Sequence, residues 1–159
     1  LRLYEEELPI LNFYGYSITS YQGTSGGQDV SGGATILNNG VAVRLTGNTW
    51  KKISFPYTIG ASTVLEFDLE ASDTGELLGI GFDDDQLYDS KQYLLGGAHT
   101  NANMADPGVS SYVTGSGKRH YSIAVGRLYR GSMTYLVFIM DDDADASGNA
   151  TFSNIMIHE

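Results

Sequence analysis

The 159-residue chain contains no cysteine, which excludes disulfide bonds, thiolate zinc sites and cysteine nucleophiles. Basic residues are also scarce, since nine Lys and Arg stand against nineteen Asp and Glu and give a formal net charge of −10. Such a negative field repels phosphate backbones and anionic lipid, so nucleic acid and membrane surfaces are poor partners. No apolar run approaches the roughly 18 residues that cross a bilayer. The chain has only three prolines and is 42% hydrophobic, a composition that folds, and its length suits one domain over residues 1–159.

The hydrophobic residues recur with a period of two, which is typical of β-strands. In the segment 63–70, Leu65, Phe67 and Leu69 share one face, and three acidic residues occupy the other, the pattern of a half-buried strand. Short segments of the same kind, bounded by Gly, Asn, Asp or Ser, predict further strands at residues 11–16, 34–37, 41–46, 49–55, 77–82, 121–125, 134–140 and 151–157.

Many short strands without a helix long enough for a crossover predict an all-β fold, an antiparallel β-sandwich with jelly-roll topology. Asn39-Gly40 lies between two of these strands, and both residues tolerate positive φ, so we expect a hairpin there. The segments 22–33 and 96–117 are rich in turn-forming residues and are predicted to be surface loops.

Acidic residues gather in two short segments that each follow a predicted strand. Neighbouring carboxylates repel one another unless a cation neutralises them, and hard divalent cations prefer oxygen ligands, so we predict bound Ca²⁺. The second segment begins like an EF-hand loop but has Ala146 and Phe152 where such a loop needs Gly and Glu, which rejects an EF-hand. The alternative is a pair of solvated acidic loops. The predicted metal ligands are Asp83, Asp85, Asp89, Asp141, Asp143 and Asp145.

Tyrosine is abundant, with eleven residues against six Phe and one Trp. Several tyrosines stand beside polar or loop residues, and a flat ring with a hydroxyl suits the C–H face of a sugar ring edged by hydroxyls. Tyrosine also fits half-buried β surfaces, so a structural role is the alternative for each of them. The candidate ligand-binding residues are Trp50, Tyr57, Tyr88, Tyr93, Tyr112 and Tyr129.

The sequence offers little support for catalysis, since it contains neither an H-E-x-x-H pair nor a G-x-S-x-G elbow. The segment 66–70 resembles the E-x-D-x-E strand of laminarinase-type glycoside hydrolases, in which the two outer carboxylates act as nucleophile and acid/base. An alternative function is therefore a small glycoside hydrolase that uses Glu66 and Glu70.

Three stretches, at residues 40–53, 63–69 and 152–157, together resemble the jelly-roll carbohydrate-binding modules attached to xylanases and glucanases. The first is similar to a stretch of those modules in which Leu45, Gly47 and Trp50 have counterparts, and the last is similar to their C-terminal strand. The resemblance implies a secreted, non-catalytic module that binds a polysaccharide, xylan or β-glucan first, beside a tethered catalytic domain. It also implies a Ca²⁺ near the segment 141–145 that contacts sugar hydroxyls. A structural or adhesive sandwich is the third hypothesis.

Overall fold

The computed structural model describes residues 9–21, 27–86, 91–97 and 112–159, and β-strands dominate these residues. Strands form where the hydrophobic period is two, because neighbouring side chains then point to opposite faces and one face meets the core. The described part of the chain contains short 3-10 helices but no α-helix, and none of its helices is long and apolar enough to cross a membrane. The elements are η1 (Phe13–Gly15), β1 (Thr19–Ser20), β2 (Gly33–Leu37), η2 (Asn38–Gly40), β3 (Ala42–Thr46), β4 (Thr49–Ile59), β5 (Val64–Asp73), β6 (Leu77–Asp83), β7 (Tyr93–Gly96), β8 (Arg119–Ile123), η3 (Val125–Arg127), β9 (Gly131–Asp141) and β10 (Asn149–His158).

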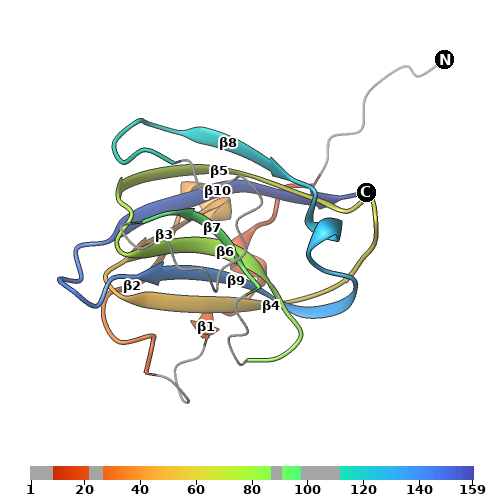
Figure 1. The fold of residues 1–159 in the computed structure, drawn as a ribbon, viewed down its shortest axis with the longest axis horizontal. Helices are drawn as coiled ribbons and strands as arrows, with labels where there is room; N and C mark the ends of the chain where they lie inside the picture. Colours follow the sequence, from red (N-terminus) through yellow and green to blue (C-terminus); the bar gives the residue numbers. More distant parts are fainter. Residues whose placement is uncertain (1–8, 22–26, 87–90, 98–111) are drawn as a thin grey trace.

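The strands pair into two antiparallel five-stranded sheets that pack against each other (Figure 1). Sheet A has the order β1-β4-β9-β6-β7, and sheet B has the order β2-β3-β10-β5-β8. In sheet B, β10 is central and pairs with β3 on one side and β5 on the other, whereas β8 is an edge strand that pairs with β5. The antiparallel β-sandwich is confirmed, and the jelly-roll topology stays a prediction.

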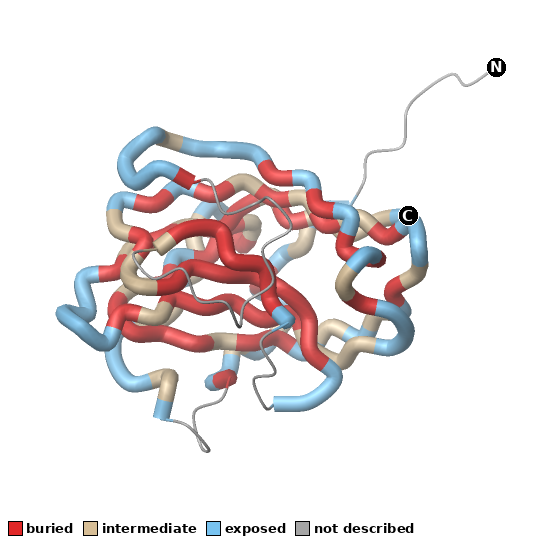
Figure 2. The backbone as a smooth tube through the Cα atoms, in the orientation of Figure 1, coloured by how far each residue is buried: buried red, intermediate tan, exposed pale blue. Residues whose placement is uncertain are grey.

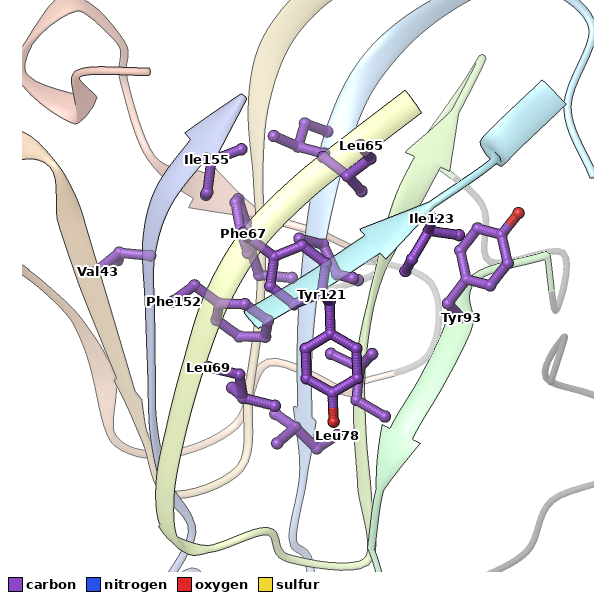
Figure 3. Close-up of a cluster of buried hydrophobic side chains, with 14 of the residues drawn as sticks. Val43, Leu65, Phe67, Leu69, Leu78, Tyr93, Tyr121, Ile123, Phe152 and Ile155 are labelled. Carbon is purple, nitrogen blue, oxygen red and sulfur yellow. The ribbon is translucent and has the colours of Figure 1, made fainter. Parts of the chain in front are cut away.

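The core lies between the sheets and is built from the inward-facing residues of both. On β5, Leu65, Phe67 and Leu69 are fully buried, as their alternation predicts. The Phe67 ring packs on Tyr121 of β8 at 5.2 Å and on Phe152 of β10 at 5.8 Å between centroids (Figure 3). Fully burying a ring of this size contributes about 1.5–3 kcal/mol, so these contacts fix which face of sheet B points inward. The acidic residues of β5 consequently point outward.

The outer face of sheet A is buried as well. Every residue of β6 is buried (Figure 2). Residues 136–140 of β9 are also buried, and their side chains alternate between two apolar clusters instead of between core and solvent. The second cluster contains Trp50, whose indole stacks on the Tyr21 ring at 6.2 Å and 15°. The broad sheet face that carries a row of exposed polar side chains is therefore the outer face of sheet B. Besides Tyr21 and Trp50, the second cluster contains Leu77, Leu94, Val137 and Ile139.

The predicted strand at residues 11–16 is wrong, because this segment forms η1. Asn12 is the reason: its side-chain oxygen accepts a hydrogen bond from the Tyr14 backbone N–H at 2.9 Å and caps the helix. The short strands β1 and β7 were not predicted, because two and four residues are too few to display a period.

The predicted hairpin at Asn39-Gly40 is confirmed, although its turn is longer than two residues. Pairing of β2 with β3 ends at Leu37 opposite Ala42, and Asn38, Asn39 and Gly40 all have positive φ. A Cβ at Gly40 would lie 2.1 Å from the Asn12 side chain, so glycine is required there. Of the two predicted loops, residues 22–26 and 98–111 lie outside the described residues.

Candidate functional site

A depression of about 460 Å³ opens on the outer face of sheet B. Its floor is the middle of the sheet, where β10 runs between β3 and β5. The hairpin between β2 and β3 borders it on one side, and the turn before β8 borders it on the other. We call this depression the polar groove, since all but one of its lining side chains are polar. The lining residues are Leu37, Asn38, Arg44, Glu70, Ser72, Lys118, Asn149, Thr151 and Ser153.

Three side chains from adjacent strands form the middle of the polar groove. Thr151 of β10 is paired with Arg44 of β3 on one side and with Glu70 of β5 on the other. Arg44 and Glu70 are exposed, and neither side chain makes a hydrogen bond or ion pair with another described residue. A guanidinium only donates hydrogen bonds and a carboxylate only accepts them. The groove therefore presents an unused donor and an unused acceptor on opposite sides of a hydroxyl.

A network of acidic and imidazole side chains adjoins the polar groove on the same face. Glu66 of β5 contacts two histidines at once: its Oε1 lies 2.9 Å from Nε2 of His120, and its Oε2 lies 2.5 Å from Nε2 of His158. His120 comes from β8 and His158 from β10, so one carboxylate joins three strands. We call Glu66, Asp68, His120, Asn154 and His158 the imidazole network.

Asp68 connects the other side of this network. Its Oδ1 lies 2.8 Å from Nδ1 of His120, and its Oδ2 accepts a hydrogen bond from the Asn154 amide at 2.9 Å. Asn154 has φ 53° at an irregularity in the pairing of β10 with β5, a conformation that Asn tolerates better than most residues. The irregularity turns the Asn154 side chain toward Asp68 on the outer face.

The charges of the imidazole network stabilise one another. The hydrogen bond from His158, and then that from His120, holds the pKa of Glu66 below its ordinary value. Burial works to raise the pKa of Asp68, but hydrogen bonds from Asn154 and His120 outweigh it and lower the pKa. The pKa of His120 is raised by its bonds to Asp68 and Glu66, and that of His158 by its bond to Glu66. All four directions favour imidazolium–carboxylate pairs in mildly acidic solution.

The same contacts argue against Glu66 as a catalytic carboxylate. As predicted, Glu66 and Glu70 share the outward face of β5. A glycosidase acid/base needs a raised pKa, whereas the histidines lower that of Glu66. Both oxygens of Glu66 are already bound by imidazole nitrogens, so neither is free to approach a sugar carbon. The geometry does not favour the glycosidase alternative.

Four of the six aromatic candidates are buried, three in the core and Trp50 in the second cluster, with exposed fractions between 1% and 7%. The Tyr112 hydroxyl bonds backbone groups of Ala71 and Gly117, and the Tyr129 hydroxyl bonds those of Phe82 and Lys91. These rings present no face to solvent, so we assign them structural roles in place of the predicted sugar platform. The four are Trp50, Tyr93, Tyr112 and Tyr129, and burial raises the pKa of Tyr93 to about 12. Tyr88 lies outside the described residues.

Tyr57 is the remaining aromatic candidate and is partly exposed. Its ring stacks on Phe55 at 6.1 Å and 16°, and Phe55 in turn contacts Tyr16 at 6.0 Å. Burial, followed by the hydrogen bond to Glu159, raises the pKa of Tyr57 to about 12. Phe55 and Tyr16 line a mostly apolar depression of about 370 Å³ at one end of the sandwich, which we call the apolar groove.

The first acidic segment brings carboxylates together. Oxygens of Asp83, Asp84 and Asp85 lie within 4.8 Å of one another, and no second group of this kind occurs among the residues described. Asp83 is buried and accepts hydrogen bonds from the Tyr21 hydroxyl and from the Asp85 backbone N–H. Oxygen donors of this type fit Ca²⁺, although Lys91 lines the same hollow as Asp83 and also supplies positive charge. Asp89 lies outside the described residues.

The second acidic segment does not bring its predicted ligands together. Asp145 instead accepts bonds from the backbone and hydroxyl of Ser147, and these bonds lower its pKa. The Asp141 carboxylate accepts a hydrogen bond from the Trp50 indole N–H at 3.4 Å. Asp143 is exposed and forms no close carboxylate group with Asp141 or Asp145. The metal site predicted at Asp141, Asp143 and Asp145 therefore lacks structural support, because Asp141 and Asp145 have hydrogen-bond partners within the protein and the three carboxylates do not form a close group.

Sequence reasoning missed the groove residues Arg44 and Lys118 and the imidazole partners His120 and His158. The sequence did contain a signal for the acidic residues of the site, since the period of two in the segment 63–70 already placed them together on the outward face of a strand. The pairing of β5 with β8 and β10 was not readable from the sequence. That pairing is what brings the isolated histidines to the carboxylates.

Comparison with known proteins gives no family for this chain. No protein-family description matches the sequence, and no curated protein matches it significantly.

Solved structures do share its fold. The glycoside hydrolase domain of Endo-D from Streptococcus pneumoniae R6 aligns at a TM-score of 0.51 with 10% identity, over 89% of this chain and 21% of that one. A structure of domains CD of another protein aligns at 0.51 with 15% identity, over 96% of this chain and 66% of that one. The chain thus spans less than two thirds of either structure. The family 30 carbohydrate-binding module of a cellulosomal cellulase from Clostridium thermocellum aligns over 81% of this chain and 89% of that one, with 20% identity. Its TM-score of 0.44 is too low to carry an argument.

Proposed function

We propose that this chain is a non-catalytic carbohydrate-binding module that holds a polysaccharide in the polar groove. The observation that carries the proposal is the position of Arg44 and Glu70, both without a partner among the described residues, on either side of Thr151. A sugar hydroxyl accepts from a guanidinium through its oxygen and donates to a carboxylate through its hydrogen. A ligand with several hydroxyls is therefore suited to use both groups together.

The net charge of the whole protein favours a neutral glycan, although the groove itself has one positive charge in excess. Lys118 and Arg44 are cationic and Glu70 is anionic, and hydroxyls and amides occupy most of the remaining lining. A sulfated or uronate-rich chain would be repelled by the net charge of −10 carried by the whole protein. Xylan and β-glucan are the first ligands to test. With individual hydrogen bonds of modest strength, we expect dissociation constants from micromolar to millimolar, about −8 to −4 kcal/mol.

The test is titration of the protein with soluble xylan and β-glucan by calorimetry. Removing a charged hydrogen-bonding group costs about 1.5–3 kcal/mol, so Arg44→Ala and Glu70→Gln should each weaken binding about tenfold or more. Arg127→Ala is the matched control, because it removes an exposed arginine elsewhere and should leave affinity unchanged. Equal affinity of all three variants would contradict the groove as the binding site. Release of reducing ends, abolished by Glu66→Gln, would instead support the glycosidase.

We also propose that Ca²⁺ binds at the group formed by Asp83, Asp84 and Asp85. The closeness of their carboxylates supports this, because each neighbouring charge destabilises the others. A cation that binds only the folded state at a hundredfold excess over its dissociation constant stabilises by about 2.7 kcal/mol. EDTA should therefore lower the melting temperature, and Asp84→Asn should remove this effect whereas Asp143→Asn should retain it. A melting temperature that does not respond to calcium or EDTA would refute the site.

The remaining elements of the proposal concern context. We propose that the module is secreted and tethered to a polysaccharide-degrading catalytic domain, as the sequence resemblance implies. Sharing its fold with a domain of a much longer glycoside hydrolase is compatible with such an arrangement. Tethering would compensate for modest affinity, because a linked module raises the effective concentration of the enzyme at the polysaccharide.

A further inference from the structure

We propose that protonation of His120, which shares Glu66 with His158, controls how firmly β8 and the Lys118 turn that precedes it are held against β5, so that the groove binds ligand best in mildly acidic solution. The ligand part rests on the proposed function. The control of β8 does not, since it concerns the protein alone.

The contacts of His120 place it between two strands. Its Nδ1 lies 2.8 Å from Asp68 and its Nε2 lies 2.9 Å from Glu66, so one imidazole ring on β8 contacts two carboxylates on β5. Only the protonated ring carries hydrogen on both nitrogens and donates to both carboxylates at once. When the ring loses a proton, one of these two bonds loses its donor, and both lose the attraction between opposite charges.

Strand β8 is the element of sheet B most open to such a change. It is an edge strand held by five residue pairs with β5, from Leu69 opposite Arg119 to Leu65 opposite Ile123. Three of its five residues are exposed. Edge segments with few buried contacts open at lower free energy than the centre of a sheet. Lys118, which lines the polar groove, immediately precedes this strand.

The network also adjoins the groove on its other side. Asn154, which donates to Asp68, directly follows the groove residue Ser153 on β10. His158 binds the second oxygen of Glu66 and thereby connects the end of β10 to β5. Protonation of His120 and His158 thus strengthens existing contacts of β5 with both of its neighbouring strands, β8 and β10.

The charged groups around the two histidines support the direction of this control. His120 faces Glu66 and Asp68 of β5, with Lys118 acting on Asp68 from the turn before β8. His158 faces Glu66 across the sheet and Glu159 beside it on its own strand end. Hydrogen bonds raise the pKa of both histidines above 6.5, those of His120 to Asp68 and Glu66 and that of His158 to Glu66, and the charges of these carboxylates act in the same direction. The contacts are therefore complete below that pH and weaken as the pH rises through the raised values.

Hydrogen exchange of the free protein tests the control of β8. Backbone exchange of residues 119–123, corrected for its intrinsic pH dependence, is compared at about pH 5.5 and about pH 8.5, on either side of histidine titration. We expect the opening equilibrium of this segment to rise about fivefold with pH in the unmodified chain, a coupling of about 1 kcal/mol. His120→Gln keeps a neutral hydrogen-bonding side chain and should remove the rise, whereas Thr58→Gln on β4 should retain it. His99 is present in every variant, so it does not account for a difference between them.

Ligand binding forms the second arm, with xylan and β-glucan as probes. An affinity about fivefold higher at the acidic pH, lost in His120→Gln, is the expected result. If neither glycan binds at any pH, the proposed function fails while the exchange result still decides the control of β8. Exchange that does not depend on pH, or that depends on it equally in His120→Gln, overturns the inference even when glycan binds.

Discussion

Replacing Tyr112 by phenylalanine should destabilise the protein although the ring and its packing are kept. The Tyr112 hydroxyl accepts a hydrogen bond from the Ala71 backbone N–H at 2.9 Å and donates one to the Gly117 carbonyl at 2.6 Å. Its own backbone N–H donates to the Leu95 carbonyl at 3.1 Å. Tyr112 therefore connects β7 of sheet A with β5 of sheet B.

The size of the effect follows from where β8 begins, since its first residue, Arg119, is the last partner of β5. The pairing of β5 with β8 stops at Leu69, so beyond this residue β8 offers no hydrogen-bond partner to β5. The Tyr112 hydroxyl instead accepts the hydrogen bond of the Ala71 backbone N–H. Ala71 is 1% exposed, and water does not replace the lost acceptor at such a position. A buried N–H left without a partner costs about 1–3 kcal/mol, and the weakened Gly117 carbonyl adds about 0.5–1 kcal/mol. We expect a total of about 1.5–4 kcal/mol.

Urea denaturation followed by Trp50 fluorescence measures this change, because the single tryptophan is buried against Tyr21 and is exposed on unfolding. Tyr112→Phe should lower the midpoint with an unchanged slope, and the melting temperature should fall by roughly 3–16 °C. Tyr14→Phe is the matched control, since Tyr14 is 68% exposed and its variant should unfold like the unmodified chain. A Tyr112→Phe variant within about 0.5 kcal/mol of the unmodified chain would refute the reasoning.

Two other substitutions test the fold and the network. Gly32 has φ +76°, and a Cβ there would lie 1.8 Å from a backbone oxygen, so Gly32→Ala should lower the free energy of unfolding by more than about 2 kcal/mol in the same denaturation assay. Gly33→Ala is the control and should be nearly neutral, because a Cβ at Gly33 has nothing within 4 Å. Glu66→Gln should cost about 1 kcal/mol, a value discounted because the His120 side chain is 51% exposed. Because the pKa of Glu66 is lowered from 4.5 and those of His120 and His158 are raised from 6.5, this cost should be largest between these values, and should shrink as the pH falls through the lowered pKa or rises through the raised ones. A cost of Glu66→Gln that stays constant across that range would contradict the network.

The fold was largely readable because its signal is local. The alternation in the segment 63–70 corresponds directly to β5, and Asn39-Gly40 marks a real hairpin. The exception at residues 11–16 has a local and a non-local cause: Asn12 caps η1 through the nearby Tyr14 N–H, and its amide also donates to the Asn39 carbonyl 27 residues away. A sequence pattern contains no information on that second contact.

The candidate site was less readable, because burial of an aromatic ring depends on what packs over it. The position of Tyr112 beside polar residues indicated exposure, whereas its ring lies in the core and its hydroxyl satisfies backbone groups. Similarly, the acidic residues 141–145 resembled metal ligands, but Asp145 is bound locally by Ser147 and Asp141 accepts a hydrogen bond from the distant Trp50 indole. Arg44 and Glu70 lie 26 residues apart in the sequence. They come together in the polar groove only because β10, with Thr151, pairs between their two strands.

Nuclear magnetic resonance of the isotopically labelled protein, titrated with xylo- and cello-oligosaccharides, tests the central claim most directly. Binding in the polar groove predicts that the largest amide shift changes fall at Arg44, Glu70 and Thr151. Changes confined to the apolar groove around Tyr16 and Phe55, or no change at millimolar oligosaccharide, would contradict the claim that sheet B binds the glycan.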